Sequence, residues 1–320
     1  MGHYRHLTTV ERENAMLLLA KGLSLRAIAR KLNRATSTVS RELDRNSAQD
    51  GSYRASYADK HYRKRRKHCG RRLIFANPKT AQYVVERILY KWTPEQIAGR
   101  AKLECFPVTF SYVTIYRAID RHVLPYSLKK ELRFKSKYKK HKIDDKRGEM
   151  QGITSIQVRP ASVENRRRIG HWESDTVLGQ RKTGAIGTHV ERKSGYLIAF
   201  KLDGSSSEEF NAASIHAFAS IPRKYRKTFT VDRGKEFTLH CELAASLDAN
   251  IYFCDPYSPW QRGTSENTNG LLRQFFPKKT SFATIANKAL EHVVALLNNR
   301  PRKRLGWKTP AEVFLKNIRR

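Results

Sequence analysis

The sequence has little acid and no long apolar run, and each shortage excludes a class of protein. Aspartate and glutamate total 29 against 63 lysines and arginines, which leaves a formal charge of +34 on 320 residues. Such an excess of positive charge predicts a polyanionic partner, first of all nucleic acid. A membrane surface requires a basic helix with a wide apolar face, and we find none in the sequence. The sequence also lacks an apolar run of bilayer-spanning length and the apolar segment of a signal peptide.

Cysteine is scarce as well, and common cofactor and catalytic motifs are missing. The four cysteines are scattered without a CxxC pair, at positions 69, 105, 241 and 254. This spacing argues against a zinc site or a disulfide framework and favours free thiols in a reducing cytoplasm. Neither a GxxxxGK[ST] loop nor a GxGxxG turn is present, so no nucleotide cofactor is expected. We also find no Ser/His/Asp or Cys/His set for nucleophilic catalysis.

The first fifty residues predict three short helices. Thr8 and Glu11 form a capping box at the start of the first helix, and Ser24 caps the second. The third is expected from Thr36 to Leu43, with short hydroxyls and an arginine on its outward face. This pattern is typical of a helix-turn-helix, whose last helix enters the major groove of DNA; the alternative is an ordinary three-helix bundle. The candidate DNA contacts are Arg34, Ser37, Thr38, Ser40 and Arg41.

More basic and helical sequence follows before any strand pattern begins. Residues 62–72 are rich in lysine and arginine, and we expect a linker or a helix end that lies along phosphates. Three capped helices then begin near positions 78, 94 and 112, which predicts a second helix-turn-helix. Its candidate DNA contacts are Thr114 and Arg117. The densest basic block, residues 129–147, is expected to be an exposed arm or linker.

The pattern changes near residue 153, where apolar residues begin to come in strand-like runs. Strands are expected at 171–179, 186–190, 196–202, 228–232 and 251–254, and helices at 210–221 and 236–249. Three strands, a helix and then alternating strands and helices indicate an α/β domain with a mixed five-stranded sheet.

Three acids fall where such a sheet places its functional sites. Asp175 lies within the first strand, Asp232 ends the fourth, and Glu266 begins the helix after the fifth. Sites in open α/β sheets form beside the carboxyl ends of strands. Three carboxylates converging there are suited to two Mg²⁺ ions for phosphodiester chemistry. Glu173 shares a strand face with Asp175 and is a candidate accessory ligand, and Glu236 is a further acid to test.

The loop before Glu266 carries further candidates for contact with DNA. We expect Arg262 and Arg273 to contact phosphates rather than to form salt bridges in the core. For Trp260, stacking on a base and packing beneath the loop carry equal weight. Taken alone, Glu266 also suits a plain helix start, where an acidic residue is favoured by the helix dipole.

Several long motifs of this chain resemble the IS30 family of bacterial insertion-sequence transposases. They are GHWESDTVLG (170–179), TVDRGKEF (230–237) and DPYSPWQRGTSENTNGLLRQFFPK (255–278), together with SRELDRN (40–46), WTPEQIAGR (92–100) and NNRPRKRLGWKTPAEVF (298–314). The resemblance implies an RNase H-like catalytic domain whose DDE triad is Asp175, Asp232 and Glu266. It also implies Mg²⁺-dependent cutting at the terminal inverted repeats and joining to target DNA, with Mn²⁺ as a substitute ion.

The expected organisation is therefore all-α helix-turn-helix domains followed by the α/β catalytic domain. The expected boundaries are 1–50 and 77–125 for the two DNA-binding domains, 51–76 and 126–160 for basic linkers, and 161–320 for the catalytic domain. A homo-oligomer on DNA, by default a dimer, is expected at the bacterial nucleoid.

Two other functions stay open. One is a catalytically silent DNA-binding regulator that keeps the catalytic domain only as a scaffold. The other is a retroviral-type integrase, which the tandem helix-turn-helix units and the missing HHCC zinc pattern argue against.

Overall fold

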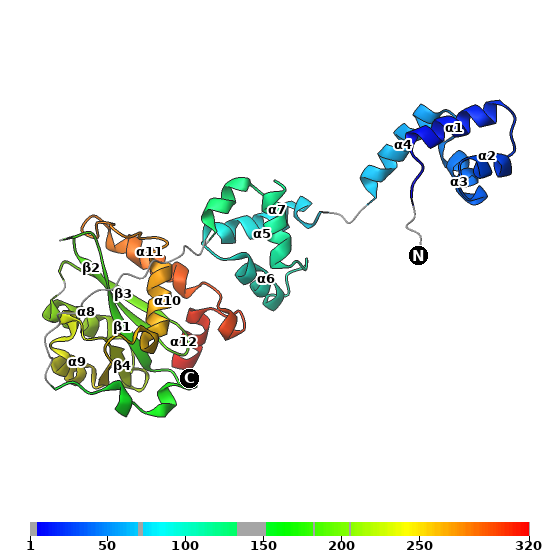
Figure 1. Ribbon diagram of the computed structural model, residues 1–320. Coiled ribbons are helices and arrows are strands. Elements are labelled where there is room, and N and C mark those ends of the chain that lie inside the picture. The colour runs from blue at the N-terminus through cyan, green and yellow to red at the C-terminus, as the bar shows by residue number, and fades with distance from the viewer. Residues whose placement is uncertain (1–4, 70–72, 133–151, 182, 205, 320) are drawn as a thin grey trace. The chain divides into compact units, whose positions relative to one another are not determined.

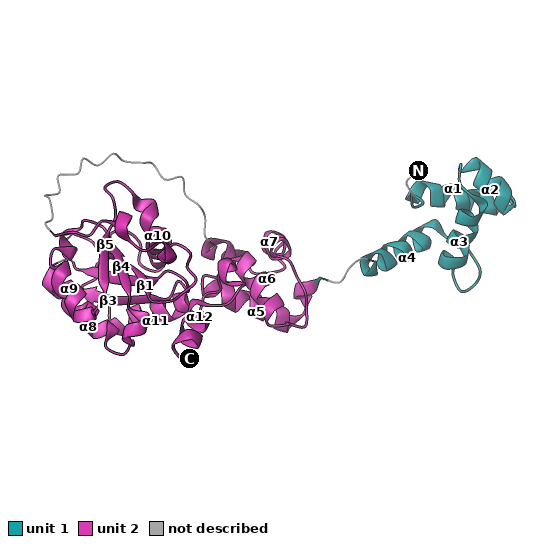
Figure 2. Cartoon of the chain, turned by 90° about the horizontal axis from the view of Figure 1, so that it is seen from below, with its two compact units in different colours: residues 1–73 teal, residues 74–320 magenta. Residues whose placement is uncertain are grey.

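The computed structural model describes residues 5–69, 73–132, 152–181, 183–204 and 206–319. The chain forms two compact units, residues 1–73 and 74–320 (Figure 2). Most of the basic block at 129–147 lies outside the described residues.

The first unit is a small helical domain with its own core. Its helices are α1 (Thr9–Ala20), α2 (Leu25–Lys31), α3 (Thr36–Asn46) and α4 (Ala55–His68). The capping box at the start of α1 and the serine cap of α2 are present as predicted. The third helix begins at the expected residue and runs three residues longer, to Asn46. Small and aliphatic side chains fill the core: Ala15, Ile28, Ala29 and Val39.

Helix α4 corrects the expectation of a linker over 51–76. It packs on α1 and α3, with two of its alanines buried. Arg12 of α1, only 1% exposed, joins the three helices. Its guanidinium lies 2.7 Å from Glu42 of α3 and 3.2 Å from Asp59 of α4, and it stacks on the ring of Tyr62. A helix end over 62–72 was one of the two expectations, but the full length of α4 was not expected, because its few apolar contacts come from alanines and a buried ion pair supplies the rest.

The second unit begins with the three further helices that the caps predicted. They are α5 (Pro78–Leu89), α6 (Pro94–Leu103) and α7 (Tyr112–Asp120). They enclose a separate apolar core that includes Val84, Ile88, Ile97 and Ile115.

A mixed five-stranded sheet forms the centre of the second unit, as expected (Figure 1). Its strands are β1 (His171–Leu178), β2 (Ala185–Glu191), β3 (Leu197–Leu202), β4 (Thr228–Val231) and β5 (Asn250–Phe253). They lie in the order β3-β2-β1-β4-β5. The first three strands pair antiparallel, whereas β4 and β5 run parallel to β1. This arrangement confirms the expected fold class.

Helices cover both faces of the sheet. On one face, α8 (Ser207–Phe218) and α9 (His240–Leu247) pack around Trp172, and Phe314 of α12 (Pro310–Ile318) joins this core. On the other, α10 (Gly263–Leu272) and α11 (Asn287–Asn298) pack on Val177 and β2. Strand alternation turns the side chains of Glu173 and Asp175 toward this second face, together with Val177. The acids of β1 therefore face α10.

The end of the chain ties α6 to the sheet domain. The guanidinium of Arg100 on α6 forms two bonds with the carboxylate of Glu312, at 2.8 and 2.6 Å. Buried Arg300 donates to the side chains of Gln96 and Gln274, both at 2.9 Å. The helical and α/β parts of the second unit thus share a polar interface.

Candidate functional site

The three candidate acids meet where β1 and β4 run side by side. Glu173 stands opposite Thr230 in this parallel pair, and two further steps along both chains bring Asp175 beside Asp232. Asp232 directly follows the end of β4. Glu266 comes from the first turn of α10, which packs on β1 and β2. Three elements therefore bring one acid each to the same end of the sheet.

The guanidinium of Arg262 lies between the two aspartates. Its Nη1 is 3.1 Å from Asp175 Oδ1, and its Nη2 is 2.7 Å from Asp232 Oδ2. Nη1 also donates to the carbonyl of Ser174 at 3.1 Å. Arg262 is only 9% exposed. The expectation that Arg262 contacts phosphate rather than forming core salt bridges is therefore wrong for this structure, because two unneutralised carboxylates side by side require a cation.

Neutral donors also form hydrogen bonds with both aspartates. Asn269 of α10 donates its Nδ2 to Asp175 Oδ2 at 2.8 Å, and the amide of Thr176 donates to Oδ1 at 2.9 Å. The amide of Gly234 donates to Asp232 Oδ1 at 2.9 Å. Burial raises the pKa of Asp175; the Arg262 guanidinium lowers it, and the Asp232 carboxylate raises it again. The two carboxylates are thus oriented from several sides.

Glu266 lies near this pair on the exposed side of α10. Partial burial raises the pKa of its carboxyl; Arg262 lowers it, and the carboxylates of Asp175 and Glu173 raise it again. Across the described residues, no three His, Cys, Asp or Glu side chains are close enough together to hold a metal ion. The triad therefore converges on one place without closing into a set of ligands, and the guanidinium lies between two of its members.

Glu173 has a different role from the accessory ligand that the sequence suggested. Its side chain is fully buried, and Oε2 accepts a hydrogen bond from the amide of Ser265 at 2.8 Å. That amide belongs to the first turn of α10, so Glu173 caps the helix that carries Glu266. Arg192 lies 3.5 Å from its other oxygen. Because Glu173 is committed to the helix end, it positions the site rather than lining it.

Glu236 lies beside the acids of the site. From the sequence it was only a further acid to test. A Cβ atom on Gly234 would lie 2.4 Å from Glu236 Oε2 and 2.9 Å from Asp232 Oδ1, so the two carboxyl groups lie close together. Burial raises the pKa of Glu236, and the carboxylates of Asp232 and Asp175 add to the effect. The signal in the sequence was an acid four residues after Asp232 in TVDRGKEF.

The outward face of α3 carries the residues expected to contact DNA. Ser37 and Arg41 are exposed, and Thr38 and Ser40 are half-buried. Nε of Arg41 donates to the carbonyl of Ser37 at 2.8 Å. Arg34 lies before the helix, and its Nε donates to Glu11 of α1 at 2.9 Å. Arg34 therefore holds the start of the domain together, in addition to any contact with DNA.

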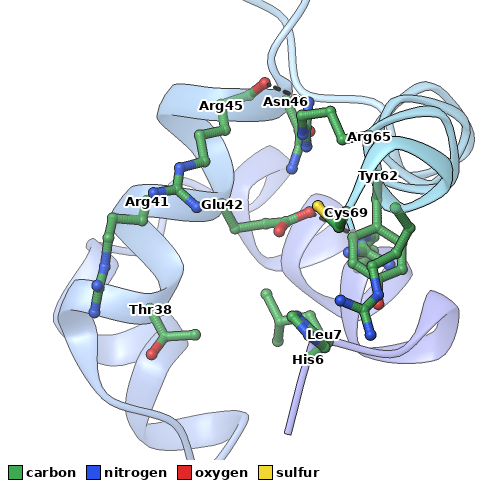
Figure 3. Close-up of a pocket in the computed structure, with 12 residues that line it drawn as sticks. His6, Leu7, Thr38, Arg41, Glu42, Arg45, Asn46, Tyr62, Arg65 and Cys69 are labelled. Carbon is green, nitrogen blue, oxygen red and sulfur yellow. Dashed lines mark hydrogen bonds and ion pairs between the residues drawn. The ribbon is translucent and has the colours of Figure 1, made fainter. Parts of the chain in front are cut away.

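A basic groove of about 240 Å³ runs between α3 and α4 (Figure 3). Arg41 and Arg45 line it from α3, and Arg65 and Arg66 line it from α4. Arg65 also hydrogen-bonds the side chain of Asn46 at the end of α3. The groove thus extends the cationic surface of α3 onto the helix that was expected to be a linker.

The other expected contacts have varied surroundings. Arg117 of α7 is exposed, whereas Thr114 is half-buried and hydrogen-bonds the hydroxyl of Ser111 at 3.0 Å. Arg273 donates to the carbonyl of Leu178 at 2.6 Å. Trp260 is 72% exposed, so its ring does not pack beneath the loop. Of the two alternatives for Trp260, packing beneath the loop is wrong, and stacking on a base stays a prediction.

Two domain families match parts of this chain. The helix-turn-helix domain matches residues 3–46 and ends before α4. The integrase core domain matches residues 165–259, which contain Asp175 and Asp232 and end within the loop that leads to Glu266. Among the described residues, no helix is long and apolar enough to cross a membrane.

Similar proteins match along almost the whole length. The transposase InsI for insertion sequence element IS30C of Escherichia coli (strain K12) is 41% identical over 98% of this chain and 84% of its own. The transposase for insertion sequence element IS1086 of Cupriavidus metallidurans is 37% identical over 97% of this chain and 94% of its own. Among solved structures, the catalytic core domain of BIV integrase aligns with 47% of this chain and 96% of its own, at 21% identity and a TM-score of 0.38.

Proposed function

The chain belongs to the IS30 family of insertion-sequence transposases, and from this premise we propose which of its residues bind, cut and join DNA. It is a DNA transposase, a polynucleotidyl transferase with a helix-turn-helix domain and an integrase core. Its DNA substrates are the terminal inverted repeats of an insertion sequence and a target duplex. One observation carries the assignment of the active site: Asp175 and Asp232 lie side by side on parallel neighbours and share a single cationic group.

Asp175, Asp232 and Glu266 are the residues that would hold divalent metal ions. The site suits such ions because its donors are carboxylate oxygens, which Mg²⁺ prefers, and because two of them already bind a cation. When bound, two Mg²⁺ ions, or Mn²⁺ in their place, supply the Lewis acidity that activates the attacking oxygen and stabilises the leaving one. Glu236 is close enough to Asp232 to act as a further ligand or proton acceptor.

The protein's own contribution is to fix these carboxylates before the DNA arrives. Asn269 and the amide of Gly234 each hold one oxygen of an aspartate, which sets the direction of the remaining lone pairs. Glu173 anchors the start of α10 and so fixes the position of Glu266 in the first turn of that helix. Such preorganisation lowers the cost of assembling the site during the reaction.

The helical parts supply DNA binding. We assign sequence reading to Ser37, Thr38 and Arg41 on α3, because short hydroxyls and an arginine suit the major groove. Thr114 and Arg117 on α7 are assigned to a second stretch of the repeat. Trp260 is assigned to a DNA base near the acids, since its ring is exposed beside the site.

An insertion sequence has two ends and each chain has one acid site, so we propose a homodimer as the working assembly on DNA. The bacterial cytoplasm, at the nucleoid, is the proposed place of action, and it suits the four free cysteines.

A strand-transfer assay with the ends of the element tests this function. The parent protein is expected to cut the labelled ends and join them to a target duplex, and Asp232→Asn is expected to bind the ends without cutting them. A parent protein that binds the ends but never cuts or joins them would instead be a DNA-binding regulator.

A further inference from the structure

We propose that Arg262 is an internal counter-cation that takes the place of a divalent ion between Asp175 and Asp232 and must leave before ions bind. The inference rests on the proposed function, because it assumes that these aspartates hold metal ions. It assigns to Arg262 a positioning role that opposes metal binding, in contrast to the phosphate contact suggested by its neighbours in the sequence.

The contacts of the guanidinium carry the proposal. Its two terminal nitrogens bond one aspartate each, at 3.1 and 2.7 Å, so the planar group bridges the pair as a bound ion would. A divalent ion held by both aspartates would need the oxygens that now bond the guanidinium, so the two would compete for one place. Two cationic groups cannot share that space, because they would overlap and repel each other.

The arrangement of the acids agrees with competition between Arg262 and a divalent ion. The described residues hold no group of three acids close enough to ligate a metal ion, although three acids converge at this place. Withdrawing the guanidinium would free Asp175 Oδ1 and Asp232 Oδ2 on the side that it now fills. Asn269 and the amides of Thr176 and Gly234 would still hold both carboxylates in place.

The segment that carries Arg262 borders open space. It is a single 3₁₀ turn, Pro259–Arg262, and the next residue, Gly263, has no neighbour within 4 Å of its Cβ position. Gln261 closes the loop through two hydrogen bonds to Asp255, both at 2.8 Å, so the backbone is held in place. The part of Arg262 that would move is therefore its side chain.

Metal binding by the full-length protein, without DNA, tests the inference. We would titrate Mn²⁺ into the parent and into Arg262→Gln, follow free Mn²⁺ by electron paramagnetic resonance, and record melting temperatures with and without the ion. Arg262→Gln is expected to bind Mn²⁺ at least about tenfold more tightly, because no ion pair has to break first. Its melting temperature without metal is expected to fall, and the rise on adding Mn²⁺ should exceed the parent's.

Two variants complete the design. Arg223→Gln removes an exposed arginine–aspartate pair with Asp248 elsewhere in the same domain, and it is expected to leave the affinity for Mn²⁺ unchanged. Arg262→Lys keeps the charge, but its single ammonium cannot bridge both carboxylates as the fork does, so its affinity is expected to lie between parent and Arg262→Gln. If Arg262→Gln does not fold, Arg262→Lys decides the question.

Asp232→Asn separates failure of the inference from failure of the proposed function. If Asp232→Asn loses Mn²⁺ while the parent, Arg262→Gln and Arg262→Lys bind it equally well, Arg262 does not compete and the metal site stands. If Asp232→Asn binds Mn²⁺ as tightly as the parent, the metal site itself is misassigned, and the inference fails with it.

Discussion

At the scale of single residues, acids of similar appearance in the sequence have separate tasks. Glu266 is exposed at the acid cluster, whereas Glu173 is fully buried and caps α10. Asp175 and Asp232 share one guanidinium. These acids differ in the groups that their carboxylate oxygens contact. Removing their charges is therefore expected to have different effects.

Replacing Glu266 by Gln is expected to abolish both cleavage and strand transfer while folding and end binding stay near normal. Glutamine keeps the size and the helix but loses the charge that holds a divalent ion. Asp175→Asn and Asp232→Asn are expected to match it, and combining them should add no further loss, because residues that act as one unit are not additive. Cleavage and joining of labelled ends, beside a gel-shift measurement, are the readouts. A Glu266→Gln protein that cuts near the parent's rate would mean that the triad is misassigned, with Glu236 as the next acid to change.

Glu173→Gln is expected to behave differently, because Glu173 positions α10. Losing the carboxylate weakens the bond to the Ser265 amide and removes one of the two acids beside buried Arg192, whose other partner is Glu164, so the free energy of unfolding should fall by about 1–3 kcal/mol. Chemical denaturation measures this fall, and a Mn²⁺ titration measures metal affinity, which should stay within about threefold of the parent's. Loss of Mn²⁺ as complete as in Asp232→Asn would make Glu173 a ligand after all.

At the scale of elements, α4 changes the description of the DNA-binding unit. The matched helix-turn-helix domain ends at residue 46, yet α4 packs on it through buried Arg12 and forms the second wall of the basic groove (Figure 3). We predict different roles for the two walls. An arginine on α3 is expected to read bases, whereas the arginines on α4 are expected to contact the phosphate backbone.

The double change Arg65→Ala with Arg66→Ala is expected to weaken binding to every DNA sequence alike. Two lost phosphate contacts should reduce the slope of log K against log salt by about 1.8. Arg41→Ala should instead cost about 1–3 kcal/mol on the terminal repeat and little on unrelated DNA. Fluorescence anisotropy on both duplexes at several salt concentrations separates the two effects.

Arg54→Ala serves as the control for these changes, because Arg54 directly precedes α4, does not line the groove and pairs with Asp50 at 3.6 Å. An unchanged salt slope in the double variant would remove α4 from the DNA interface.

At the scale of the whole molecule, the net charge and the contacts within the second unit matter most. The formal charge of +34 spreads over both units and far exceeds what one recognition helix needs. In the second unit, Arg100 and Arg300 tie α6 to the segment that follows α11, so the second DNA-binding candidate and the acid site belong to one unit.

End binding by the full chain is therefore expected to depend steeply on salt. Each neutralised phosphate contributes about −0.9 to the slope of log K against log salt, so 6–10 contacts would cost about 10³–10⁵ in affinity between 50 and 200 mM. A filter-binding or anisotropy series over that range measures it. An affinity indifferent to salt would contradict an interface dominated by phosphates.

Local features of the sequence were sufficient to predict where helices begin and where the strands lie. Capping residues such as Thr8, Asn77 and Thr93 set the starts of helices, because a cap satisfies backbone groups within its own turn. Alternating apolar runs located the five strands to within a residue or two. Motif spacing brought out Asp175, Asp232 and Glu266, because acids at strand ends converge by topology.

Only the tertiary structure decided what each charged side chain contacts. Arg262 lies between two aspartates from different strands, Glu173 caps a helix about ninety residues away in the chain, and α4 is held by an arginine of α1. Each of these partners is distant in sequence, so no local pattern records it. The physical reason is that a buried charge must be neutralised by whichever opposite charge the fold brings near it, and that neighbour is set by packing rather than by sequence spacing.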